Sequence, residues 1–282
     1  MKKITIKASD GYPLAALIAK PIEESSQTII ISSATGVKKE FYKNFAQFLV
    51  HNGYNVLLYD YRGIGESAPD DLKLSDAYMH DWGILDMNAA LNYMVEVQNL
   101  TNIVWIGHSV GGQLVGFLEK REHIKHIISI SAALGYWGYF PYPMRMVIWT
   151  LWYVISPILT KIYGYGTLKK VGWGEDLSKN TFLEWRGWCM NKDYYGDFLQ
   201  EKLHTDKFYD FTVPITAIYL SDDYIANDIT APLMSKFYPN STFDVLKLQV
   251  KRYTSHKVGH SGIFKKKFQN SLWPILVGIV EG

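Results

Sequence analysis

The chain of 282 residues is poor in several features that would define its class early. Cysteine occurs once, at Cys189, so an internal disulfide is excluded. The 29 basic and 27 acidic side chains leave a formal net charge of +2 without a long basic stripe, which argues against a nucleic-acid partner. No metal-ligand spacing is visible, and no G-x-G-x-x-G follows an expected strand. We therefore predict neither a metal nor any other cofactor.

Long apolar runs are also scarce. The start of the chain, MKKITIKASDGYP, has two lysines without an apolar segment after them, so we expect no secretory signal and a reducing, cytoplasmic location. Residues 146–160 are uncharged, but Pro157 and Lys161 interrupt the stretch before it reaches the roughly 20 residues of a membrane span. It predicts a buried or lid helix. Contact with a membrane surface is a less favoured alternative, and a span is less favoured still.

Strand and helix patterns alternate over most of the chain, from about residue 28 to 131 and again from 214, which predicts a mostly parallel sheet with helices on both faces. Strands are expected at residues 3–8, 13–20, 28–33, 54–60, 102–106, 125–131, 214–220 and 243–252, the first two as an antiparallel hairpin at one edge. Helices are expected around 41–49 and 82–93 and over 110–120, 229–238 and 263–281, the last restarting at Pro274.

The segment between strands 125–131 and 214–220 is too long for a plain crossover, and aromatic residues, 15% of the chain, concentrate in it. We expect residues 133–210 to form a mostly helical, aromatic-rich cap at the carboxyl edge of the sheet, where open α/β sheets bind ligands. Residues 1–132 and 211–282 then form the core domain.

One short stretch crowds small residues between a strand and a helix. Gly107, Ser109 and Gly111 fit G-x-S-x-G, the nucleophile elbow. A serine on this strained turn exposes its hydroxyl at the top of the sheet, and the glycines stand where a side chain would collide. The N–H of Val110 then faces the substrate at the start of a helix, where the dipole favours developing negative charge. The context predicts Ser109 as a nucleophile; a structural glycine turn is the alternative.

Three further stretches point the same way. YDYRGIGES (59–67) matches a D-x-R-G-x-G-x-S turn, LSDDYIAN (220–227) an acid turn after a late strand, and KVGHSGIF (257–264) a histidine loop before the last helix. With the elbow, they make the chain resemble the serine α/β-hydrolase superfamily of esterases, lipases and thioesterases, over essentially everything outside 133–210. The resemblance implies an α/β-hydrolase fold and a triad in the chain order serine, acid, histidine.

Only two of the eight histidines, His256 and His260, follow the acid turn. His260 stands in a Gly-His pair before the final helix, as the superfamily's base does, and is the expected base; His256 is the alternative. His108 is next to the nucleophile, but its side chain should point away from Ser109, so we expect it to pack in the core.

The acid in similar proteins is the fourth residue of a G-x-x-D-x-x-x-P turn. Leu220 stands here for the glycine and Asn227 for the proline, so Asp223 is the expected acid and Asp222 the alternative. The acid would hold the imidazole in the right tautomer and stabilise the imidazolium.

The second oxyanion donor of such enzymes comes from the loop after the strand at 28–33. Family members usually have His-Gly there. Thr35-Gly36 takes that place in this chain, so the N–H of Val37 is the expected donor, to within one residue.

The implied chemistry is attack of Ser109 on an acyl carbon, with His260 as base, followed by hydrolysis of the acyl-enzyme. Trp149 and Trp152 in the cap are expected to line an apolar acyl pocket, although such aromatics also serve a cap's own core. A small-molecule ester or thioester of an apolar acyl group is the first substrate choice. An amidase or peptidase, and a non-catalytic binding protein of the same fold, are the alternatives. The oligomeric state is left open.

Overall fold

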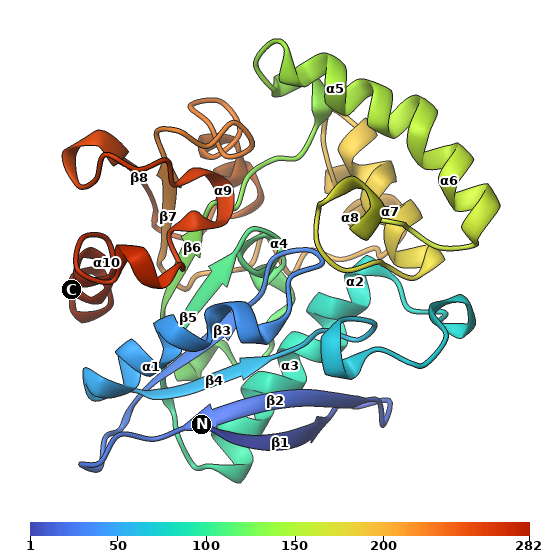
Figure 1. Ribbon diagram of the computed structural model, residues 1–282. Helices are drawn as coiled ribbons and strands as arrows, with labels where there is room; N and C mark the ends of the chain where they lie inside the picture. The colour runs from blue at the N-terminus through green and yellow to red at the C-terminus, as the bar shows by residue number, and fades with distance from the viewer.

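A single eight-stranded sheet crosses the computed structural model, which describes residues 1–282 (Figure 1). The strand order is β1-β2-β4-β3-β5-β6-β7-β8, and all neighbours from β4 to β8 are parallel. The β1–β2 hairpin joins antiparallel to β4 at one edge, so the predicted mixed sheet is confirmed. The strands are β1 Lys2–Lys7, β2 Pro13–Ala19, β3 Gln27–Ser32, β4 Asn55–Tyr59, β5 Asn102–His108, β6 Ile124–Ile130, β7 Ile215–Leu220 and β8 Phe243–Leu248.

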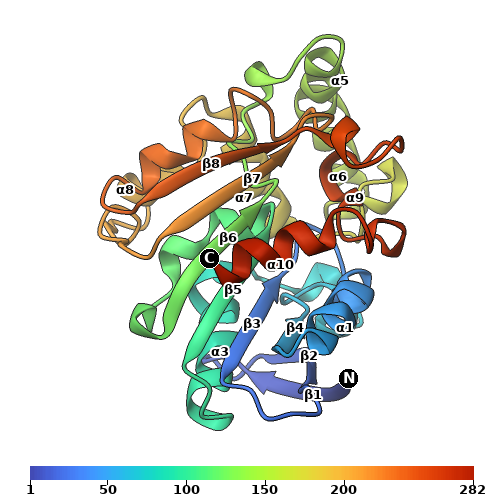
Figure 2. The same cartoon turned by 90° about the vertical axis from the view of Figure 1, so that its left-hand side faces the viewer.

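Helices cover both faces of the sheet, because its central strands are apolar on both sides. In β3, Ile29 and Ile31 point into one core and Ile30 into the other. The first core packs under α1 (Lys43–His51) and α10 (Trp273–Glu281), which cross the near face of the sheet in Figure 2. The second packs under a helical run from Met79 to Val97, which includes α2 (Met79–Asp81) and α3 (Asn88–Asn92), and under α4 (Val110–Gln113). Such two-sided burial is typical of parallel strands.

Three expected helices are shorter than their patterns. The helix after β5 ends at Gln113, and a 3₁₀ turn, Val115–Phe117, follows. Residues Pro232–Phe237 form only a 3₁₀ turn, and the last helix begins at Trp273. Close packing accompanies the first case: a Cβ at Gly116 would lie 2.4 Å from the ring of Phe208, so this turn has no room for a side chain at residue 116.

The segment between β6 and β7 contains four helices over the carboxyl ends of the strands, drawn yellow-green to yellow in Figure 1. They are α5 Met144–Thr150, α6 Ser156–Tyr163, α7 Lys179–Met190 and α8 Gly196–Glu201. The segment contacts the core through the N–H of Glu175, which donates to the carbonyl of Gly36 at 2.7 Å. The division into a core and a cap at residues 133 and 210 stays a prediction.

One helix departs from expectation. Helices α5 and α6 are joined by one wider turn into a continuous helix, Met144–Tyr163, and Pro157 lies in the first turn of α6 without ending it. By length and composition alone, these 20 residues could cross a membrane. The expectation that Pro157 and Lys161 interrupt the apolar stretch is therefore wrong for its backbone, because the wider turn Leu151–Ile155 lies just before Pro157 and lets the helix continue past it.

Candidate active site

Ser109 stands between β5 and α4 with φ 52° and ψ −115°, a conformation that a residue with a side chain rarely adopts. Its N–H donates to the carbonyl of Ile130 at 2.9 Å, which holds the turn against β6. The glycines around it have steric reasons. A Cβ at Gly107 would lie 2.3 Å from the carbonyl oxygen of Gly111, and one at Gly111 would lie 2.4 Å from that of Ser32. The sequence therefore folds here into the strained turn that the G-x-S-x-G spacing predicts.

A carboxylate and an imidazole meet beside this turn. Asp223 follows β7, and its Oδ2 lies 2.8 Å from Nδ1 of His260 in α9 (Gly259–Gly262). The Asp223 side chain is fully buried, and its Oδ1 accepts the N–H of Ile225 at 2.9 Å. One oxygen thus fixes the turn and the other fixes the ring, which leaves Nε2 of His260 for the cavity.

The neighbouring carboxylate of Asp222 has different partners. Its two oxygens accept the N–H groups of Val258 and Gly259 at 2.8 and 3.0 Å, so it anchors the loop that carries His260 but does not touch the ring. The alternative base, His256, is exposed, and its backbone N–H bonds to Thr254 within the loop. Geometry thus pairs Asp223 with His260.

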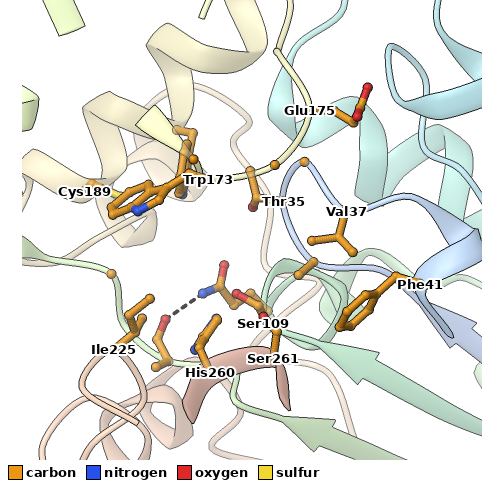
Figure 3. A pocket seen from close by; sticks show the side chains of 18 of the residues that line it. Thr35, Val37, Phe41, Ser109, Trp173, Glu175, Cys189, Ile225, His260 and Ser261 are labelled. Carbon is orange, nitrogen blue, oxygen red and sulfur yellow. Dashed lines mark hydrogen bonds between the residues drawn. The ribbon is translucent and has the colours of Figure 1, made fainter. Parts of the chain in front are cut away.

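Ser109 and His260 face one cavity (Figure 3). Their side chains make no direct hydrogen bond to each other. Contacts of this kind are often long before a substrate binds, so the arrangement brings a nucleophile and an oriented base to the same space.

The loop after β3 lines the same cavity with Ala34, Thr35, Gly36 and Val37. The N–H of Val37, the expected second oxyanion donor, donates to the carbonyl of Ala34 at 3.1 Å and closes a tight turn. The N–H groups of Thr35 and Gly36 have no such acceptor. The N–H groups that are free to bind an oxyanion are therefore those one or two residues before Val37. The N–H of Val37 itself is used in the turn at Gly36, whose φ is 69°.

A buried lysine holds the far end of this loop. Nζ of Lys39 lies 2.6 Å from Asp60 and 2.7 Å from Glu66, and its own N–H donates to the second oxygen of Asp60 at 2.7 Å. Burial disfavours the charge, but the hydrogen bonds to Asp60 and Glu66 outweigh it and raise the pKa of Lys39. Asp60 belongs to the D-x-R-G-x-G-x-S stretch, which thereby acquires a role: it fixes the loop beside Ser109.

The cavity beside Ser109 and His260 has a volume of about 700 Å³ and a largely apolar wall. Its aromatic side chains come from both the core and the 133–210 segment: Phe41, Phe140, Trp173, Trp185, Tyr194 and Tyr224. Cys189 also lines it, but burial raises the pKa of its thiol, so the thiol is protonated. The volume suits a small ligand with an apolar part.

The two tryptophans expected in this wall are elsewhere. Trp149 is on the outer side of α5, 36% exposed, and stacks on Tyr153. Trp152 is buried inside the segment, where it packs on Trp185 with ring centroids 5.1 Å apart. The prediction that Trp149 and Trp152 line the cavity is therefore wrong. Helical direction decided this, since the continuous helix Met144–Tyr163 turns both side chains away from the cavity that Trp173 and Trp185 line.

Gln113 is a site residue that sequence reasoning missed. Its Nε2 donates to the carbonyl of Ala133 at 2.6 Å, and its Oε1 accepts the hydroxyl of Tyr194 at 3.1 Å. Its backbone carbonyl accepts the hydroxyls of Tyr195 and Tyr238. Gln113 therefore ties the helix after the elbow to the 133–210 segment. The only signal for Gln113 in the sequence is its position four residues after Ser109.

These features define the class of protein: a serine α/β-hydrolase, with a nucleophile elbow, an acid and a histidine at the carboxyl edge of a mostly parallel sheet. A family model described as serine aminopeptidase, S33, matches residues 23–173, more than half of the chain. The chain belongs to this family. The matched region contains Ser109 and ends before Asp223 and His260.

Solved structures share the fold at low identity. An esterase from Exiguobacterium antarcticum matches with a TM-score of 0.63 and 18% identity over the full length of both chains. A thermophilic esterase from Thermogutta terrifontis matches with 0.56 and 14% over 100% of this chain and 98% of its own. Mouse alpha/beta hydrolase domain-containing protein 10 matches with 0.56 and 15% over 100% and 99%. No curated protein sequence gives a significant match.

Proposed function

We propose that the protein hydrolyses a carboxylic ester or thioester of an apolar acyl group through a Ser109–His260–Asp223 triad. The observation that carries the proposal is the 2.8 Å contact between His260 and Asp223 in the wall of the cavity that Ser109 faces. Asp223 orients the imidazole ring of His260 and stabilises the imidazolium. His260 takes the hydroxyl proton of Ser109 while the hydroxyl oxygen of Ser109 bonds to the acyl carbon. The alcohol or thiol leaves with that proton, and water then releases the acid from the acyl-enzyme.

The oxyanion of each tetrahedral intermediate needs two donors. The N–H of Val110, at the first position of α4, is the first. The second comes from the loop of Thr35, Gly36 and Val37. With the N–H of Val37 directed at Ala34, those of Thr35 and Gly36 are the free ones, so the proposed donor shifts to this pair.

The family description raises peptide amides as a second substrate class. An aminopeptidase needs a free carboxylate near the serine to bind the substrate's ammonium group. The two acidic residues of the cavity wall, Glu40 and Glu175, are both paired with lysines: Glu40 with Lys39, and Glu175 with Lys38 and Lys169. The apolar wall and these occupied carboxylates favour an uncharged acyl group over a peptide N-terminus.

The test combines active-site labelling with a substrate panel. A fluorophosphonate should label wild-type protein at Ser109 and leave Ser109→Ala unlabelled. p-Nitrophenyl esters of increasing chain length, acyl thioesters and aminoacyl p-nitroanilides then compare the substrate classes. Turnover of esters with loss of several orders of magnitude in Ser109→Ala supports the proposal. Labelling at another serine contradicts the triad, and faster turnover of the anilides than of every ester contradicts the substrate class.

A further inference from the structure

The exposed side of the α5–α6 helix is apolar except for Lys161. Six of its exposed side chains are large and apolar: Met146 (49% exposed), Val147 (56%), Tyr153 (39%), Val154 (43%), Ile158 (54%) and Ile162 (66%). We call these six residues the outer face. The helix lies at the outer edge of the molecule, on the side of the 133–210 segment away from the sheet (Figure 1). A surface helix normally places charged side chains on this side, so the outer face requires a covering partner.

Two hydroxyls of this helix bond to its own backbone. The hydroxyl of Thr150 donates to the carbonyl of Met146 at 2.9 Å, and that of Ser156 donates to the carbonyl of Trp152 at 3.1 Å. Thr150, half-exposed beside the outer face, therefore presents no unpaired hydroxyl to a hydrocarbon phase, in which such a group is costly.

Aromatic and basic side chains border the outer face. Trp149 and Tyr153 stack at 5.3 Å and are both exposed, as is Tyr142 before the helix. Lys161 lies within α6, between Ile158 and Ile162 of the outer face, and Lys170 follows the helix; neither makes an ion pair with a carboxylate. Nζ of Lys170 lies 3.9 Å from the ring centre of Tyr163. Tryptophan and tyrosine prefer the depth of lipid headgroups, and unpaired lysines attract anionic ones.

We propose that the outer face of α5–α6 docks on an anionic phospholipid surface, with the helix lying in the plane of the membrane. A transverse orientation conflicts with the inner side, where Ile148 and Trp152 are buried and Arg186 donates to the carbonyl of Trp152 at 2.7 Å. Trp152 also packs on Trp185 of the cavity wall, so the docked surface lies one layer of side chains from the cavity. The inference goes beyond the proposed function and does not depend on it.

The test is flotation of the full chain with vesicles of phosphatidylcholine alone or of equal parts of phosphatidylcholine and phosphatidylglycerol. Wild-type protein and Ser109→Ala should float with the mixed vesicles. Val154→Glu/Ile158→Glu should lower the partition coefficient at least about tenfold, because two exposed apolar side chains that insert into the membrane on docking become charged. Lys161→Gln/Lys170→Gln should lower it about fivefold per lysine on mixed vesicles and leave it unchanged on phosphatidylcholine. The matched control is Ile22→Glu/Val97→Glu, which adds the same two charges at exposed apolar residues outside the 133–210 segment. This variant should bind like wild type.

Each alternative occupant gives a distinct result. Bound protein that resists extraction with sodium carbonate would mean a span and would overturn surface docking. Analytical ultracentrifugation without lipid tests self-association. An oligomer that Val154→Glu/Ile158→Glu converts to a monomer, without binding to either vesicle, would assign the outer face to a second copy of the chain. A monomer that binds neither vesicle would also overturn the proposal. Circular dichroism and thermal unfolding of each variant show that it is folded.

Discussion

The imidazole of His108 donates its Nε2–H to the backbone carbonyl of His260, at 3.1 Å. A carbonyl only accepts, so the proton of the ring is on Nε2. Burial, and then the neighbouring His260, hold the pKa of His108 well below its usual range, so the ring is neutral. Its Nδ1 therefore accepts the hydroxyl of Tyr42 at 2.7 Å, and that hydroxyl accepts the N–H of Ala34 at 2.9 Å. A chain of hydrogen bonds thus joins the loop after β3 to the backbone of the proposed base.

This chain makes Tyr42 a testable positioning residue. Tyr42→Phe leaves two buried groups unpaired, the N–H of Ala34 and Nδ1 of His108, and should lower the free energy of unfolding by about 1–3 kcal/mol. Both ends of the chain border the site, so kcat for an ester should fall by roughly tenfold or more. Urea unfolding and steady-state kinetics measure the two effects. Tyr93→Phe, which removes a hydroxyl that bonds only to Gln98, is the control. An unchanged kcat in Tyr42→Phe would show that these hydrogen bonds stabilise the fold but do not position the catalytic groups.

Substitution of the adjacent carboxylates Asp222 and Asp223 should affect kcat to clearly different extents. Asp223→Asn favours the wrong tautomer of His260 and should lower kcat by about 10⁴-fold, the size of the effect of the same substitution in a serine protease with this triad. Asp222→Asn keeps one acceptor oxygen for the backbone N–H groups of Val258 and Gly259. It should therefore lower kcat by roughly tenfold or less. Kinetics on a short ester, with circular dichroism for the fold, provide the comparison. A larger loss in Asp222→Asn than in Asp223→Asn would reverse the assignment.

The cavity wall predicts which tryptophan sets the acyl preference. Trp185→Ala removes part of the wall and should raise the ratio of kcat/KM for long over short acyl esters at least about tenfold. Trp149→Ala, measured without lipid, should leave the ratio unchanged, because Trp149 is on the outer side of α5. The measurement is a p-nitrophenyl ester series. An equal shift in both variants would place the acyl group against α5 instead.

An ion pair between the core and α7 predicts a pH-dependent stability. Nδ1 of His80 lies 2.9 Å from Glu184; burial opposes protonation, but this contact outweighs it and raises the pKa of His80. Because the pKa is higher in the folded state, the contribution to stability is complete below the unfolded value of about 6.5 and is lost as the pH rises through the folded value. His80→Gln should therefore destabilise the protein on the order of 1 kcal/mol more at about pH 5.5 than at about pH 9.

Thermal unfolding at both pH values measures this difference for His80→Gln. His256→Gln is the control, since the side chain of His256 is exposed and makes no ion pair. A loss of the same size at both pH values would show that His80 acts only through packing.

Much of this protein could be predicted from its sequence, because the decisive patterns are local. Continuous apolar runs such as 28–33 and 54–60 require a parallel sheet covered on both faces. The glycines around Ser109 are required by backbone contacts within a few residues and one neighbouring strand. The hairpin before β3, the elbow and the family all follow from such patterns, and the structure or the family match agrees with each.

Only the tertiary structure decided matters that depend on direction in space. Asp222 and Asp223 are adjacent in the chain, but the course of the backbone after β7 sends one to a loop and the other to His260. The phase of the α5–α6 helix, set where its turn Leu151–Ile155 packs on α7, turned Trp149 outward and left Trp185 at the cavity. A helix pattern fixes which residues share a face. What that face meets is decided by contacts between segments distant in sequence, because burial depends on the whole chain.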